Sequence, residues 1–293
     1  MEPEPFRAPV DPDYSNRRGF DESFIGAEIP LPRLAAAAKR IDPAGAPAGR
    51  DAVLRYEHFS IAMSPARKLA YLVAVNIDGA RTIDLGPRGD DHWIFDARIP
   101  EDEQMGDWLY DDNDFDRGHL VRRLDPVWGD SEAEAVRAEA DTFHFTNCAP
   151  QHWRFNRLRE FWQGIESYVL DNVALHDLRI SLFTGPVLAD DDPEMEGTQV
   201  PREYWKVVAM RKQDGTLTAA AYLLSQGELL RAPPEEFVFG EYKTFQLPVS
   251  ELEERTGLEF GELRDRDAFA RLRAAEVGVP RRIELVQHSQ MVL

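Results

Sequence analysis

Two residues that can act on a phosphate ester stand two positions apart in the segment DDNDFDRGHLVRR, residues 111–123. The imidazole of His119 can take a proton from water near neutral pH, and the guanidinium of Arg117 can hold phosphate oxygens through paired hydrogen bonds. Alternation along a strand would place both side chains on one face, and Gly118 would let the backbone pass close to a ligand. The spacing indicates a catalytic site, although these residues alone leave open a purely structural histidine.

The same segment has aspartates at alternating positions, as the start of a calcium-binding loop does. An EF-hand loop needs a turn glycine at its sixth position and a bidentate carboxylate at its twelfth. Counting from Asp112, these positions hold Arg117 and Arg123. Two cations in those places exclude the calcium loop, and the acidic run 101–116 is expected to be a solvated loop.

A second group of polar residues follows about thirty positions later, in FTNCAPQHWRFNRLREFWQGIE, residues 145–166. The order DRGH, then TN-x-x-PQ, then FN and W-x-x-x-E resembles the DNA/RNA non-specific endonucleases of the ββα-metal type, which include the endonuclease G group. Segments before and after these motifs, such as HFSIAMSPARKLAYLVAVNIDG and FTGPVL, are similar to the same family. The resemblance extends from about residue 56 to 265.

The resemblance implies a role for each matched residue. His119 is the general base that activates the attacking water, and Arg117 stabilises charge on the phosphate in the transition state. Asn156 is the direct protein ligand of a catalytic Mg²⁺, for which Mn²⁺ is a substitute. Glu166 holds a metal-bound water through a hydrogen bond.

One departure from the family pattern bears on the last role. The family places the tryptophan four residues after the asparagine, whereas Trp162 follows Asn156 by six. If one helix runs unbroken from Asn156, Glu160 or Gln163 would share its face and could replace Glu166.

Substrate contacts are expected from residues that flank the two motifs. Arg122 and Arg123 could hold neighbouring phosphates, with pairing to the acidic loop as the alternative. His152 stands beside the expected metal site, and Gln151 could contact the substrate or set the loop before the helix. Phosphate contacts carry no base information, so the expected activity is hydrolysis of both DNA and RNA with little sequence preference.

Two other functions stay open from the sequence. A catalytically silent nucleic-acid-binding protein could use the same fold, and a phosphodiesterase for small substrates would need a similar narrow basic site. A net charge of −19 excludes a protein that coats nucleic acid, and therefore confines any polyanion site to a local cluster such as the arginines between residues 117 and 159.

The sequence also bears on cellular location, disulfide bonds and assembly. The sequence has neither a signal peptide nor an apolar run of about 18 to 20 residues, which predicts a cytoplasmic protein that does not enter a membrane. The single cysteine, Cys148, excludes an internal disulfide and is expected to be buried and inert. The family resemblance implies a homodimer as a plausible assembly.

The expected fold is α+β, a ββα-metal (His-Me finger) nuclease fold with a central antiparallel sheet and flanking helices. Residues 1–50, rich in Pro, Ala and Gly, are expected to form an arm, and residues 51–293 the nuclease domain, with the core beginning after the arm. Helices are predicted over 131–141 and from Asn156, and a hairpin turn at residues 77–79. Strands are predicted at 59–64, 68–75, 81–85, 92–96, 142–147, 179–188, 204–211 and 217–226, with a helix as the alternative for the last segment.

Overall fold

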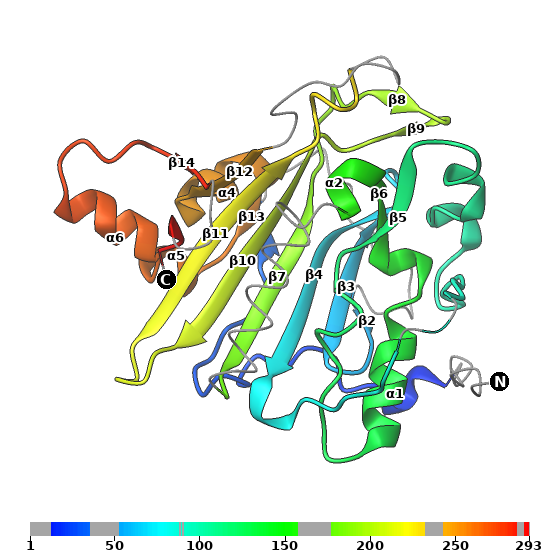
Figure 1. Cartoon of the computed structure of the whole chain (residues 1–293), viewed down its shortest axis with the longest axis horizontal. Helices are drawn as coiled ribbons and strands as arrows, with labels where there is room; N and C mark the ends of the chain where they lie inside the picture. Colours follow the sequence, from blue (N-terminus) through cyan, green and yellow to red (C-terminus); the bar gives the residue numbers. More distant parts are fainter. Residues whose placement is uncertain are drawn as a thin grey trace.

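A computed structural model of the chain describes residues 13–35, 53–87, 89, 91–157, 177–231, 243–285 and 290–292. Its main feature is an eight-stranded sheet in the order β14-β12-β11-β10-β7-β4-β3-β2, in which every pairing is antiparallel (Figure 1). The strands are β2 (Leu54–Arg55), β3 (Phe59–Ser64), β4 (Leu69–Asp78), β7 (Arg179–Val187), β10 (Glu203–Arg211), β11 (Leu217–Ser225), β12 (Lys243–Leu247) and β14 (Ile283–Glu284).

Both faces of this sheet are covered, which explains why its central strands are nearly continuous apolar runs rather than alternating ones. On one face Val73 and Val75 of β4 lie in a core that includes Phe115 and Phe155. A second core on the other face contains large side chains of the same strands, such as Trp205 of β10. The segments that carry the DRGH and TN-x-x-PQ motifs therefore lie on one face of the sheet.

The second face is covered partly by the chain's own N-terminal region. Phe20, Phe24, Ile25 and Ile29 are buried in the second core together with Leu252 of α4 (Val249–Thr256). The expectation that the core begins after residue 50 is therefore wrong for residues 13–35, because four large apolar side chains in that segment are removed from water. The domain boundary itself stays a prediction.

The remaining elements are short. In the described ranges the other helices are α1 (Glu132–Asp141), α2 (Trp153–Arg157), α5 (Glu262–Asp265) and α6 (Ala268–Ala275). Small antiparallel pairs join β1 (Arg33–Leu34) to β13 (Leu258–Glu259), β5 (Phe115–His119) to β6 (Cys148–His152), and β8 (Glu194–Met195) to β9 (Thr198–Gln199). The same ranges contain the 3-10 helices η1 (Tyr14–Asn16), η2 (Gly79–Arg81), η3 (Glu101–Glu103), η4 (Asp107–Leu109) and η5 (Phe145–Asn147).

Several sequence predictions are confirmed locally. Helix α1 begins after Ser131, whose side chain accepts a hydrogen bond from the N–H of Glu134 as an N-cap. The strands predicted at 59–64, 204–211 and 217–226 correspond to β3, β10 and β11. The α+β class with a central antiparallel sheet is confirmed.

Other predictions are wrong for identifiable reasons. The chain turns from β3 into β4 at residues 65–68, where Lys68 has a positive φ. The turn predicted at residues 77–79 lies instead at the end of the long strand β4. Residues 81–85 and 92–96 form single bridges only, Thr82 with Trp128 and Ile94 with His144. Residues 145–147 form η5 instead of a strand, since Asn147 is turned back by its N–H bond to the His144 carbonyl.

None of the helices in the described ranges is long and apolar enough to span a membrane.

Candidate active site

Strands β5 and β6 and helix α2 form a compact ββα unit on one face of the sheet (Figure 1). The register pairs Arg117 with Pro150 and His119 with Cys148, so the two sequence motifs lie side by side. The predicted strand around Arg117 to His119 is thus present. Residues 148–152, expected to be a loop, pair as a strand, and α2 begins at Trp153, three residues before Asn156.

Side chains of the central sheet fasten this unit in place. The hydroxyl of Tyr204 in β10 donates to the carbonyl of Pro150 at 2.8 Å, and the Gln226 amide donates to the same carbonyl at 3.2 Å. The Oε1 atom of Gln226 also accepts from the N–H of His152 at 2.9 Å. At the start of α2, the N–H of Trp153 donates to the carbonyl of Asp114 at 2.8 Å, which fixes the helix against β5.

A cavity of about 850 Å³ opens where β5 and α2 meet the segment 91–94. Its volume suits a drug-sized or nucleotide-sized group rather than a single ion. The lining residues are Asp91, His92, Trp93, Ile94, Asp107, Asp116, Arg117, Asn156 and Arg157.

Within the cavity, Arg117 is held by an acidic and an aromatic partner. Its Nε donates to Oδ1 of Asp107 at 2.8 Å, and its NH2 group contacts the same oxygen. The guanidinium carbon lies 5.2 Å from the centre of the Tyr110 ring, within cation–π range. The Asp107 side chain is 62% exposed, so this ion pair is weak and can be exchanged for another anion.

Asp116 connects the strand to the helix. Its Oδ2 accepts from Nδ2 of Asn156 at 3.0 Å and from Nε of Arg157 at 2.7 Å. The hydrogen bond that Arg157 donates to Asp116 raises the pKa of Arg157. Because the amide nitrogen of Asn156 is committed to this carboxylate, its carbonyl oxygen is the atom that could ligate a metal.

Aromatic rings set the position of His119. Its ring centre lies 4.7 Å from that of Trp93 and 5.1 Å from that of Phe143, the latter edge to face. Trp93 is brought there by a bridge in which the Ile94 N–H donates to the Phe143 carbonyl at 3.0 Å. The two rings limit the orientations of the imidazole, and His119 remains partly exposed.

Two residues of the TN-x-x-PQ motif have structural positions. Asn147 is buried, accepts from the Val121 N–H at 2.9 Å and donates to the Val121 and Thr142 carbonyls, which anchors the chain leaving β5. Gln151 is fully buried against Gly118, where any side chain would clash with it. The glycine therefore lets β6 and its glutamine approach β5 closely, and Gln151 is buried instead of facing a substrate.

The other predicted substrate contacts lie apart from the cavity lining. Arg123 pairs with Glu139 of α1, not with the acidic loop that precedes it. The main-chain N–H of Arg122 donates to Asp125, and its NH1 group is buried without a hydrogen-bond partner among the residues described. His152 is buried and its Nδ1 accepts from the Arg154 N–H at 3.2 Å, a position that caps the start of α2.

Glu166, its substitutes Glu160 and Gln163, and Trp162 lie outside the described residues, so the fourth predicted role stays a prediction. Cys148 is buried, and burial raises the pKa of its thiol to about 12, as expected for an inert cysteine.

Sequence reasoning assigned Arg117 and Asn156 to the site and did not assign the other seven residues that line the cavity. Asp116 stands in the DRGH motif itself and was placed in an acidic loop, although it faces α2. Arg157 follows Asn156 directly and was counted only among the clustered arginines. Trp93 and its neighbours reach the cavity through the bridge between Ile94 and residues 143–145, which no local spacing reveals.

Comparisons with known proteins agree with this geometry. Residues 38–267 match the family model described as DNA/RNA non-specific endonuclease. The chain is 43% identical over 273 residues to a protein of Sinorhizobium fredii (strain NBRC 101917 / NGR234) described as uncharacterized protein y4fB. That match covers 88% of this chain and 41% of the relative, so the chain spans about two fifths of that protein's length.

Among solved structures, a chain from the crystal structure of an EndoG/EndoGI complex superimposes with a TM-score of 0.57 and 18% identity, covering 75% of this chain and 90% of that one. At this identity the likeness shows the fold, which is that of EndoG. The family match spans most of the chain and includes β5, β6 and α2. The chain therefore belongs to the DNA/RNA non-specific endonuclease family, a family of nucleases and hence of hydrolases.

Proposed function

We propose that the protein is a metal-dependent endonuclease that hydrolyses phosphodiester bonds of DNA and RNA. The observation that carries the proposal is the cavity shared by Arg117, Asp116 and Asn156, with His119 two residues from Arg117 on the same strand. A fold alone hosts many functions, so the support comes from this combination of base, cation and oxygen donors.

In the proposed reaction, neutral His119 takes a proton from water and the water oxygen attacks phosphorus. The bond to the 3′ oxygen breaks as the new P–O bond forms, and the 3′ oxygen takes a proton from solvent water, which leaves a 3′-hydroxyl and a 5′-phosphate. His119 then returns its proton to solvent. A histidine base must be neutral, so protonation of the base at low pH should lower the rate.

Arg117 is proposed to exchange Asp107 for the scissile phosphate. Negative charge grows on the non-bridging oxygens in the transition state, and a positioned guanidinium stabilises it more than it stabilises the ground state. The exposed ion pair to Asp107 keeps the guanidinium oriented until a phosphate replaces the carboxylate.

The donor set fits Mg²⁺, with Mn²⁺ as a substitute. The carbonyl oxygen of Asn156 and the carboxylate of Asp116 are hard oxygen ligands on one wall of the cavity, and the volume accommodates a partly hydrated ion. The ion would supply positive charge next to the leaving oxygen. Asp116 holds the Asn156 amide in one orientation.

Little sequence preference is expected because these contacts address phosphate, not bases. Because the net charge is −19, only the cations at the cavity can attract nucleic acid. The affinity for nucleic acid should therefore fall less steeply with salt concentration than that of a basic DNA-coating protein. A homodimer and a cytoplasmic location stay predictions.

The test is incubation of wild type and His119→Ala with circular plasmid and with RNA, each with Mg²⁺ and with EDTA. Wild type should cut both substrates with Mg²⁺ only, and His119→Ala should be about 100- to 10,000-fold slower. Added imidazole should restore part of the lost rate in His119→Ala, which only a missing base would allow.

Two outcomes would favour the other functions. Retained binding of nucleic acid by wild type with no turnover under any divalent ion would indicate a silent binding protein. Cleavage of small phosphodiesters but not of plasmid or RNA would indicate a phosphodiesterase for small substrates.

A further inference from the structure

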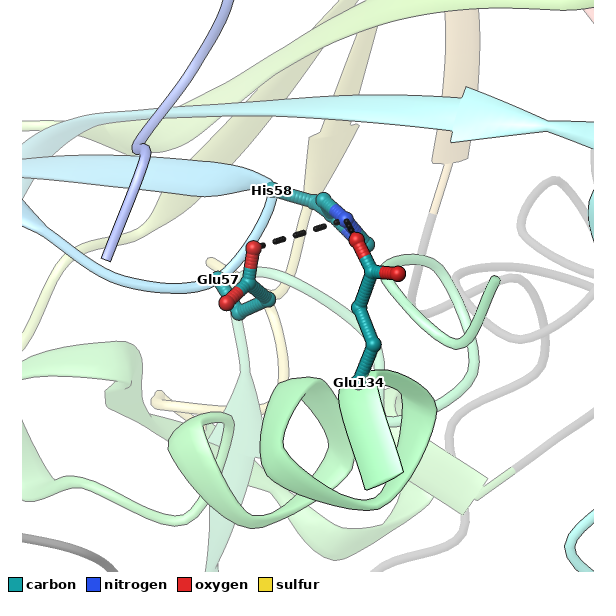
Figure 2. A group of neighbouring side chains, drawn as sticks. All are labelled: Glu57, His58 and Glu134. Carbon is teal, nitrogen blue, oxygen red and sulfur yellow. Dashed lines mark hydrogen bonds and ion pairs between the residues drawn. The ribbon is translucent and has the colours of Figure 1, made fainter. Parts of the chain in front are cut away.

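Away from the cavity, a histidine and two glutamates converge inside the protein (Figure 2). Glu57 and His58 directly precede β3, and Glu134 lies in the first turn of α1. Their exposed fractions are 0%, 3% and 6%, which is unusual for ionisable groups. In Figure 1 α1 lies below α2 and apart from it, and none of the three residues lines the cavity, so this cluster is distinct from the candidate active site.

The outer atom of each of these three side chains already has a partner. Nδ1 of His58 bonds the Pro126 carbonyl at 2.9 Å. Oε2 of Glu57 accepts from Arg137 at 2.9 Å, and Oε2 of Glu134 accepts from the main-chain N–H of Asp130 at 2.9 Å. Such outer hydrogen bonds are what orient histidine and carboxylate ligands at metal centres.

The inner atoms face one another. Nε2 of His58 lies 3.1 Å from Oε1 of Glu134 and 3.6 Å from Oε1 of Glu57, and all three atoms lie within 4.8 Å of one another. Oε1 of Glu57 is buried and accepts no hydrogen bond from the residues described. Three electron-rich atoms this close need a cation among them.

The neutral His58 ring presents a lone pair to the two glutamates. The Pro126 carbonyl can only accept, so Nδ1 of His58 carries the proton of the neutral ring and Nε2 carries its lone pair. The 3.1 Å contact between Nε2 and Oε1 of Glu134 is a hydrogen bond only in the imidazolium, so a metal ion at this point competes with a proton.

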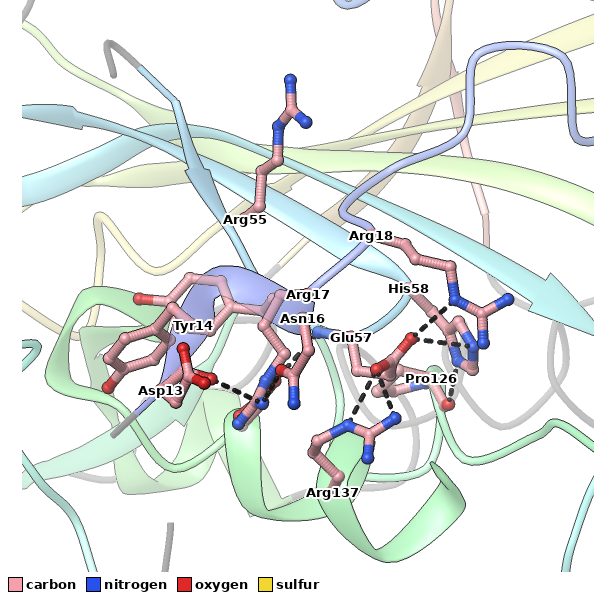
Figure 3. A network of polar contacts seen from close by, with 12 residues as sticks. Asp13, Tyr14, Asn16, Arg17, Arg18, Arg55, Glu57, His58, Pro126 and Arg137 are labelled. Carbon is pink, nitrogen blue, oxygen red and sulfur yellow. Dashed lines mark hydrogen bonds and ion pairs between the residues drawn. The ribbon is translucent and has the colours of Figure 1, made fainter. Parts of the chain in front are cut away.

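Arg18 supplies positive charge from the open side (Figure 3). Its Nε lies 3.3 Å from Oε1 of Glu57, and its NH2 group contacts Oε1 of Glu134. The side chain is 64% exposed, so it can leave without breaking the core. Arg137, in contrast, holds the outer oxygen of Glu57 and does not block the inner atoms.

We propose that Glu57, His58 and Glu134 form a second metal site, for Zn²⁺ or a similar divalent transition metal, which Arg18 covers when no ion is bound. Tetrahedral ligands about 2.1 Å from zinc lie about 3.4 Å apart, and the two distances from Nε2 bracket that spacing. One nitrogen and two oxygens leave the fourth position for water. The proposal does not rest on the nuclease function.

The test is equilibrium dialysis of chelator-treated protein against Zn²⁺, with all variants made in Asn156→Ala, which lacks one of the two proposed oxygen ligands of the nuclease metal. Asn156→Ala should bind one equivalent of Zn²⁺. Glu134→Gln, which keeps an acceptor for the Asp130 N–H, should weaken binding by more than about 100-fold, beyond the cost of losing an outer partner. Glu132→Gln, an exposed glutamate in the same helical turn, is the matched control and should bind like its parent.

A further variant separates a metal site from a plain ion-pair cluster. Arg18→Ala removes the competing cation and should tighten Zn²⁺ binding several-fold, and Co²⁺ should give the intense visible absorption of a four-coordinate site. No saturable Zn²⁺ binding by Asn156→Ala with or without Arg18→Ala would overturn the proposal. Binding that Glu134→Gln leaves unchanged would place the ion elsewhere and would overturn it as well.

Discussion

The candidate active site and the contact between residues 13–18 and α1 contain the same kinds of residue, yet in opposite settings. Arg117 and Arg157 pair with Asp107 and Asp116 at the wall of an open cavity. Arg17, in contrast, pairs with Asp141 where both side chains are fully buried. The exposed pairs can be exchanged for phosphate at low cost, whereas a buried pair is costly to break. The first region is suited to turnover and the second to holding structure.

The largest effect on stability is expected at the buried contact. Asp141→Ala should lower the free energy of unfolding by about 3–5 kcal/mol, because it leaves the Arg17 charge buried without its bidentate partner. Denaturant unfolding measures this. Asp130→Ala, which breaks the exposed pair with Arg81, is the control and should change stability by less than about 1 kcal/mol. Equal losses of unfolding free energy in the two variants would contradict the difference between buried and exposed ion pairs.

At the cavity the effect should fall on rate, not on stability. Arg117→Ala should reduce kcat by about 100- to 1,000-fold because it removes charge stabilisation in the transition state. Its free energy of unfolding should change by less than about 1 kcal/mol, since its partner Asp107 is exposed. Steady-state kinetics together with denaturant unfolding would show a structural role if stability fell while kcat did not.

A smaller, pH-dependent effect is expected at His144 in the buried contact. Burial lowers the pKa of His144, whose Nε2 accepts from the Tyr14 hydroxyl while Nδ1 donates to the Asp141 carbonyl. The unfolded state then binds a proton below about pH 6.5 that the native state does not, so wild type loses stability as the pH falls.

His144→Gln removes this pH-dependent loss. Its destabilisation relative to wild type should therefore shrink between pH 7.5 and pH 5, by at most about 2 kcal/mol. Unfolding curves at the two pH values measure the change, and His92→Gln, an exposed histidine, is the control. A destabilisation that grows at pH 5 would contradict the neutral form of His144.

The smallest effect is expected from freeing Arg117. Asp107→Asn removes the carboxylate that competes with phosphate, so KM for nucleic acid should fall a few-fold at low salt, equivalent to less than about 1 kcal/mol. Cleavage assays at two salt concentrations measure it. An increase in KM would mean that Asp107 positions the guanidinium more than it competes for it.

The candidate active site and the buried contact also differ in how much of each could be predicted from the sequence. The ββα unit lies within about forty residues and its motifs have fixed spacing, so β5 and a helix carrying Asn156 were predicted from these motifs together with the family resemblance that they carry. Strand β6 was missed because Pro150 and Gln151 are poor strand residues, and its pairing depends on Gly118 admitting Gln151.

The buried contact could not be predicted. Arg17 and Asp141 are 124 residues apart, and Tyr14 and His144 are 130 apart. The region around residues 13–35 has Pro-rich neighbours and weak periodicity, yet it is fixed by such distant partners. Local patterns carry no information on which charges meet across the fold.

The attachment of β6 to Tyr204 and Gln226 also orders events during synthesis. The ribosome releases the chain from its N-terminus, and the hairpin that carries His119 obtains its support only after residue 226 has emerged. A growing chain that ends before β10 and β11 therefore has the catalytic sequence but not the platform that aligns it. Under the proposed function, the nascent chain should therefore not cleave the messenger RNA that encodes it until that point.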